Sequence, residues 1–301
     1  MEPLIYKTNM QKTPSLVIVL IAYFSALFAA YISLPFLNDF HIIIQILFAD
    51  IVATIIIYFF SLIFKNSSIY DPYWSIIPVF IFIYFFSKSN LDFFFIPSLL
   101  MFLNILFWSI RLTSNWIKNW EGMSSEDWRY VDMRKYSGRL FEFSNFFGIH
   151  LFPTLIVFAC CIPIYYVLNI DYFINPFMFL GFFISFLGVV YEIVSDYQLY
   201  QFRIKHQGKK GIIQTGLWKY SRHPNYWGEI LFWWGLYIYV ITFSPWYVIL
   251  APISMTIMFA FVSIPWIENK ILRTRPNYTE YQQKTNFLIL ETGLIKKILN
   301  K

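Results

Sequence analysis

Residues 215–235 read TGLWKYSRHPNYWGEILFWWG, and this stretch joins a basic, aromatic segment to an apolar helix. Pro224 suits the first turn of that helix, where the missing N–H leaves no hydrogen bond unmade. Glu229 follows about one turn later, and a carboxylate at that depth in hydrocarbon is costly. The stretch therefore predicts a membrane-spanning helix that begins at a binding site on the membrane–water boundary.

The whole chain has the composition of an integral membrane protein. It is 58% hydrophobic and only 13% charged, and apolar stretches long enough to cross a bilayer recur along it. We predict an all-α, polytopic transmembrane helix bundle of about eight spans, with seven as the alternative. The predicted spans are residues 16–36, 42–64, 73–86, 91–110, 149–168, 176–194, 226–243 and 246–264.

The basic residues indicate how the spans are oriented. With eight spans, all of the 23 Lys and Arg residues except Lys88 fall on one side. Basic connections stay in the cytoplasm, so both termini are predicted there, in a bacterial inner membrane or the endoplasmic reticulum. The net charge of +6 is then a signal of topology, and we expect membrane lipids, not nucleic acid, as partners.

Two groups of charged residues suit an anionic cofactor. The N-terminus of the helix that begins near Pro224 offers unpaired N–H groups, and Arg222 adds positive charge, which together favour phosphate. Glu192, Asp196 and Arg203 share one face of the predicted cytoplasmic continuation of the sixth span. They could bind ribose hydroxyls and a phosphate, and the structural alternative is an intrahelical ion-pair ladder.

Further candidates for this site lie at the same predicted membrane boundary. Arg129 could bind a phosphate bidentately, although interfacial anchoring also explains many of these residues. The histidines have no spacing that suits a metal, so no metal is expected. The additional cofactor candidates are Arg111, Arg129, His223, Asn225, Tyr226, Glu229 and Glu268.

Candidate catalytic residues lie at the ends of the third and fourth predicted spans. Asp71, Tyr73 and Trp74 open the third span, and Trp108 ends the fourth. Asp71 could donate a hydrogen bond to a substrate carbonyl, with Trp74 as a stacking wall. The structural alternative is an Asp cap before a proline, with an aromatic interfacial anchor.

Three motifs resemble the steroid 5-alpha-reductase family of membrane reductases. They are residues 195–198 with Arg203, residues 216–229, and the tail from residue 264 to 281. The resemblance implies N-terminal transmembrane helices at 1–65 and a catalytic domain at 66–301 that holds NADPH on its cytoplasmic side. It also implies hydride transfer to the conjugated C=C bond of an enone in a steroid-like or isoprenoid lipid.

The resemblance also assigns residues by position. Asp196, Arg203, Asn225 and Glu229 match cofactor-contacting positions. The family's substrate-polarising Glu and Tyr correspond roughly to Asp71 and Trp108. Because tryptophan has no phenolic proton, the resemblance implies that Asp71 or Tyr73 polarises the substrate alone, or that the substrate differs.

Two other function classes share part of this pattern. Isoprenylcysteine and phospholipid methyltransferases, which use S-adenosylmethionine, have a similar Arg-His-Pro-x-Tyr element and acidic tail. Asn225 paired with Glu229 favours the reductase over these enzymes. A membrane scaffold without activity is the third class, and it requires Asp196 and Glu229 to be structural only.

Overall fold

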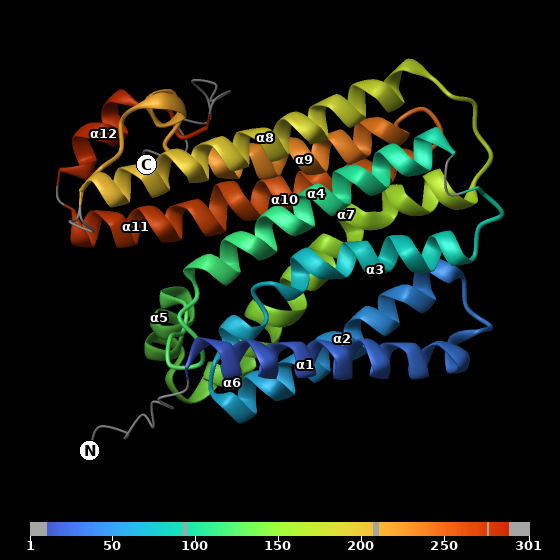
Figure 1. Ribbon diagram of the computed structural model, residues 1–301, viewed down its shortest axis with the longest axis horizontal. Helices are drawn as coiled ribbons and strands as arrows, with labels where there is room; N and C mark the ends of the chain where they lie inside the picture. The colour runs from blue at the N-terminus through green and yellow to red at the C-terminus, as the bar shows by residue number, and fades with distance from the viewer. Residues whose placement is uncertain (1–10, 93–94, 207–210, 276, 289–301) are drawn as a thin grey trace. The chain divides into compact units, whose positions relative to one another are not determined.

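The computed structural model describes residues 11–92, 95–206, 211–275 and 277–288 (Figure 1). Every regular element in these residues is a helix, which confirms the all-α class. The chain divides into two compact units, Met1–Asp171 and Tyr172–Lys301. The predicted division at residue 65 does not coincide with this boundary and stays a prediction.

Unit 1 consists of long apolar helices joined by short turns and by one helical connection. Its helices are α1 (Lys12–Ser33), η1 (Leu34–Leu37), α2 (Ile42–Phe64), η2 (Ser67–Ile69), α3 (Tyr73–Ser87), α4 (Ile96–Asn119), α5 (Trp128–Ser137), η3 (Gly138–Leu140), α6 (Phe141–Ser144), η4 (Asn145–Leu151) and α7 (Phe152–Asn169). α4 extends nine residues beyond the predicted end at residue 110, because neither Pro nor Gly interrupts it before Gly122.

Buried hydrogen bonds between short polar side chains join α2 to α7. The hydroxyls of Thr54 and Thr154 are 3.0 Å apart, and Ser61 Oγ is 3.0 Å from Nε2 of the buried His150. Tyr70, which follows η2, adds a 2.9 Å contact to the Thr154 hydroxyl. Such side chains hold helices together where apolar lipid supplies no driving force of its own.

Unit 2 contains the basic, aromatic stretch of residues 215–235. Its helices are α8 (Pro176–Lys205), η5 (Gly216–Lys219), α9 (Pro224–Val240), η6 (Trp246–Ile249), α10 (Leu250–Met258), η7 (Phe259–Ser263), α11 (Ile264–Thr274) and α12 (Tyr278–Lys284). α8 continues to Lys205, as predicted for the cytoplasmic extension of the sixth span, and α9 begins at Pro224 as predicted.

Seven helical segments among the described residues are long and apolar enough to cross a membrane. The protein is therefore a multi-pass integral membrane protein. The predicted span at residues 226–243, the seventh along the chain, forms α9, which has 17 residues and a length of about 25 Å, against about 30 Å for the hydrocarbon core. By length, the structure supports the alternative of seven spans. The termini at 1–10 and 289–301 lie outside the described residues, so their cytoplasmic placement stays a prediction.

α8 and α9 lie side by side within unit 2 (Figure 1) and approach closely through glycines. A Cβ added to Gly228 would lie 2.6 Å from the Gly188 carbonyl oxygen, and one added to Gly181 would lie 2.6 Å from the Gly235 carbonyl oxygen. Ser185 lies against Gly235 between these two contacts. Small residues of this kind let helix backbones meet within a membrane, and here they determine the register of α8 on α9.

Candidate functional sites

The glycine contacts bring two predicted cofactor residues together. A Cβ on Gly228 would lie 2.7 Å from Glu192 Cγ, so the Glu192 side chain lies on the α9 backbone one residue before Glu229. Both carboxylates are buried, and Glu229 Oε1 accepts a 3.0 Å hydrogen bond from Trp233 Nε1. The predicted burial of Glu229 within the bundle is therefore observed, and the α8–α9 contact carries two acidic groups.

The rest of the predicted α8 face runs from the interior to the surface. Glu192 is fully buried, Asp196 is half-buried and Arg203 is exposed near the end of the helix. Burial and the nearby Arg203 guanidinium lower the pKa of Arg275, an effect that Tyr278 partly opposes. Arg275 Nε is buried without a hydrogen-bond partner among the described residues. The two guanidinium groups thus interact electrostatically at this end of unit 2.

Glu268, on α11, accepts from side-chain donors of two other segments of the chain. Its Oε1 lies 2.7 Å from Arg222 Nε, and it accepts hydrogen bonds from His223 Nε2 at 2.8 Å and from the Tyr278 hydroxyl at 3.1 Å. Its Oε2 accepts from Gln282 Nε2 at 2.9 Å. Glu268 thus ties the entry of α9 to α11 and α12.

The guanidinium of Arg222 is occupied by protein acceptors. Nη1 donates to the carbonyl oxygens of Gln282 at 2.9 Å and Thr285 at 2.7 Å, and the Arg222 backbone N–H donates to the Asn286 carbonyl. This is the geometry of a residue that fastens the tail to the start of α9. The predicted phosphate contact of Arg222 stays a prediction, and these bonds would compete with it.

His223 and Tyr226, at the start of α9, belong to a row of stacked aromatic rings beside this network. Burial lowers the pKa of His223, against the opposing effect of Glu268, so the imidazole is neutral near pH 7. Its ring stacks on Tyr226, with centroids 5.8 Å apart, and Tyr226 in turn stacks on Phe259. Asn225 lies beside them, half-buried, one turn before Glu229.

The segment before α9 is fastened to the end of α8. Gly216 adopts a φ of +62°, and a Cβ there would lie 2.5 Å from the Gln198 side chain, so this position requires glycine. The Leu217 N–H donates to Gln198 Oε1 at 2.9 Å, and Trp218 Nε1 donates to the Ser195 carbonyl at 3.1 Å. These contacts join the motif at residues 195–198 to the motif that begins at residue 216.

Unit 1 places Asp71 in a second polar cluster. Asp71 accepts a short hydrogen bond from the Tyr130 hydroxyl, and its Oδ1 is 3.7 Å from Arg129 Nη2. Arg129 also donates from Nε to Asp127 Oδ1 at 2.8 Å. The structural alternative, in which Asp71 caps α3, is wrong, because Pro72 is the N-cap of α3 and no side chain caps it.

A neighbouring loop contact positions this cluster. Asn66 Nδ2 donates to the carbonyls of Met123 and Ser125 at 3.1 and 3.0 Å, and the Asp127 N–H donates to Ser68 Oγ at 2.7 Å. The turn that leads from α2 to Asp71 is therefore held against the turn that precedes α5.

The remaining predicted catalytic residues lie on α3 and α4. Trp74 and the fully buried Trp108 meet edge to face, with centroids 5.6 Å apart, and Arg111 follows on α4, half-buried. Tyr73 is buried and its hydroxyl donates to Asp50 Oδ1 at 2.6 Å. Its phenol is thus engaged by a residue for which the sequence suggested no role.

Comparison with known proteins identifies the family. A family model described as "Protein of unknown function (DUF1295)" matches residues 57–285. The chain belongs to the DUF1295 family. This family is related in general to steroid 5-alpha-reductase-like membrane proteins.

One curated relative of this DUF1295 chain is the uncharacterized protein C594.04c of Schizosaccharomyces pombe. The two are 27% identical over 207 residues, which cover 58% of this chain. The chain spans 58% of the relative's length. No solved structure matches the chain.

Two residues of the polar clusters described above, Tyr130 and Arg275, were not among the predicted site residues. Tyr130 was visible only as part of a dense charged and aromatic string, and nothing local to it indicates that it meets Asp71. Arg275 stands two residues after Arg273 on the tail, and the spacing alone does not distinguish their roles. Both positions depend on packing between segments.

Proposed function

We propose that the chain is an NADPH-dependent integral membrane reductase of a C=C bond conjugated to a carbonyl in a steroid-like or isoprenoid lipid. The observation that carries this proposal is the pair Arg203 and Arg275. Two neighbouring guanidinium groups repel each other, and an anion placed against both removes that cost. The Nε of Arg275, which is without a partner among the described residues, fits a phosphate oxygen.

The residues of unit 2 suit the parts of such a cofactor. Arg203 and Arg275 would hold phosphate, and the half-buried Asp196 would accept hydrogen bonds from ribose hydroxyls. Asn225, Glu192 and Glu229 offer amide and carboxylate groups deeper in the unit. NADPH supplies a hydride when it is bound.

The residues of unit 1 suit the activation of a carbonyl. The Tyr130 hydroxyl, which donates to Asp71 in this structure, would turn to donate to the substrate's carbonyl oxygen and would stabilise an enolate there. Asp71 would hold this hydroxyl in place before the substrate binds, and solvent would supply the proton that the α-carbon takes. A hydride supplied by the cofactor and a proton from solvent would account for the two hydrogens added to the double bond. A phenol from α5 would thus supply the proton donor that Trp108 lacks.

The alternative is an S-adenosylmethionine-dependent methyltransferase of the isoprenylcysteine or phospholipid type. The network of Arg222, His223 and Glu268 suits both classes, since it joins the tail to α9 in either case. S-adenosylmethionine carries a sulfonium cation and one carboxylate but no phosphate, so it offers Arg203 and Arg275 much less negative charge than NADPH does. The basic pair therefore favours the reductase.

Ligand-induced thermal shifts of the purified protein test this proposal. We expect NADPH to raise the melting temperature, since a ligand at 100 times its Kd stabilises by about 2.7 kcal/mol, and S-adenosylmethionine to leave it unchanged. Arg203→Gln and Arg275→Gln should each weaken NADPH binding roughly tenfold, the effect of losing one charge-assisted hydrogen bond. Tyr130→Phe should bind NADPH normally and lose reduction of an enone substrate.

Arg139→Gln is the matched control, because Arg139 is exposed and lies in unit 1. Its NADPH affinity should equal that of the wild-type protein. A shift with S-adenosylmethionine and none with NADPH would support the methyltransferase instead. If the Arg203 and Arg275 variants both bound NADPH with wild-type affinity, this pair would not be the phosphate site and the proposal would lose its main support.

A further inference from the structure

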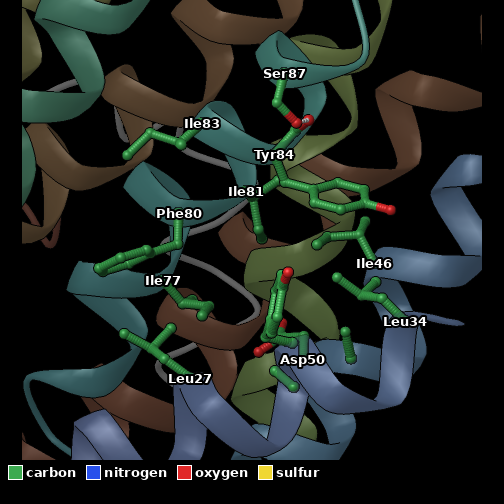
Figure 2. Close-up of a pocket in the computed structure, with 13 residues that line it drawn as sticks. Leu27, Leu34, Ile46, Asp50, Ile77, Phe80, Ile81, Ile83, Tyr84 and Ser87 are labelled. Carbon is green, nitrogen blue, oxygen red and sulfur yellow. Dashed lines mark hydrogen bonds between the residues drawn. The ribbon is translucent and has the colours of Figure 1, made fainter.

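Unit 1 contains a cavity of about 260 Å³ among α1, α2 and α3 (Figure 2). Its walls are mainly aliphatic and aromatic side chains, and Asp50 is the one residue of formal charge among those that line it. Tyr31 and Ile83 line it and are exposed, so the cavity opens at the helix surface that acyl chains would contact. The aliphatic wall includes Leu27, Leu34, Ile46, Ile77 and Ile81.

Asp50 has one oxygen without a partner. Its side chain is buried, with 3% of the residue exposed, and Oδ1 accepts the hydrogen bond from Tyr73. Oδ2 is buried and has no hydrogen-bond partner among the described residues. A buried carboxyl oxygen without a partner is costly, and an ionisable residue inside a membrane helix most often marks a binding site.

We propose that this cavity binds the head of a single-chain aliphatic alcohol, with the hydroxyl hydrogen-bonded to Asp50 Oδ2. A hydroxyl can donate to a carboxylate and can accept from a carboxylic acid, so it matches Asp50 in either protonation state. The aliphatic walls suit the first carbons of the chain, and the rest of the chain leaves through the exposed opening.

The size of the cavity restricts the occupant. Its 260 Å³ is below the range of about 300–1,000 Å³ that is typical of pockets enclosing a whole drug-sized ligand. One linear or prenyl chain suits this space better than fused rings or the two chains of a phospholipid. Asp50 precedes residue 57, where the family match begins, and the α3 part of the wall lies within that match. The inference uses neither unit 2 nor Tyr130, so it does not rest on the proposed reductase.

Photolabelling of the full-length protein in phosphatidylcholine nanodiscs tests this site. The probe is hexadecan-1-ol carrying a diazirine, and labelled peptides are located by mass spectrometry. We expect labels on α1, α2 and α3, with competition by dodecan-1-ol and none by dodecane. Asp50→Leu should reduce this labelling roughly tenfold, as expected for a lost buried hydrogen bond, whereas Asp50→Asn should retain most of it.

Two further variants keep the test decisive. Ala30→Phe fills the cavity from a half-buried position while Asp50 itself is retained, and it should abolish the labelling. Asp39→Asn removes an exposed acid between α1 and α2 and should leave it unchanged. Size-exclusion elution identifies any variant that has not folded. Equal competition by dodecane, competition only by dodecylamine, or full labelling of Ala30→Phe would overturn the proposal.

Discussion

Glu268 is the residue on which the end of unit 2 depends. Its Oε1 lies 2.7 to 3.1 Å from polar atoms of Arg222, His223 and Tyr278. The side chains of Arg222 and Glu268 are each only 10% exposed, so solvent cannot replace a missing partner. Glu268→Gln should therefore destabilise the protein by about 3–5 kcal/mol, which thermal unfolding in detergent would measure.

An exposed pair in the same tail provides the comparison. Lys284 and Glu280 form an ion pair with both side chains 68% exposed, and solvent screens such a pair strongly. Lys284→Gln should leave the melting temperature unchanged within error. Equal melting temperatures for Glu268→Gln and the wild-type protein would show that Arg222 is adequately solvated without its partner.

The α8–α9 pair is the element that positions the predicted cofactor residues. A Cβ at Gly228 would lie 2.6 Å from the Gly188 carbonyl oxygen, and a backbone carbonyl cannot turn aside as a side chain can. Gly228→Ala should therefore separate the helices and destabilise the protein by about 1–3 kcal/mol, despite the better helix propensity of alanine. Thermal unfolding would again measure the change.

Gly148→Ala, in η4, is the control for Gly228→Ala, because it makes the same substitution where a Cβ has space. A Cβ at Gly148 would have one neighbour within 4 Å, Met133 Cε at 3.9 Å, and Gly148 is exposed. This variant should be neutral or slightly stabilised. If Gly228→Ala behaved in the same way, close backbone contact would not determine how α8 and α9 pack.

At the scale of the whole molecule, the length of α9 makes its path across the membrane testable. Asn90 and Gln283 are exposed on either side of the segments in question, and the native Cys160 and Cys161 are buried. If α9 crosses, Asn90→Cys should react with an impermeant maleimide from outside intact cells, and Gln283→Cys only after permeabilisation. Reaction of both variants from outside would mean that α9 does not cross.

The positions of the helices could be predicted from the sequence alone. Each of the eight predicted spans overlaps a helix, because the length of an apolar stretch is a local property of the chain. The predicted ends of the spans were less accurate where polar residues continued a helix, as they do in α4. Helical spacing also placed Glu192, Asp196 and Arg203 on one helix, but it did not determine what each of them meets.

The sequence by itself determined that this chain is a helical membrane protein with polar and basic groups at the ends of its spans. Only the tertiary structure decided the partners of those groups. Arg222 meets Glu268 across 46 residues, and Asp71 meets Tyr130 across 59. The physical reason is that spacing within a helix specifies a shared face, whereas partners on different helices depend on register, which close contacts such as that of Gly188 with Gly228 determine.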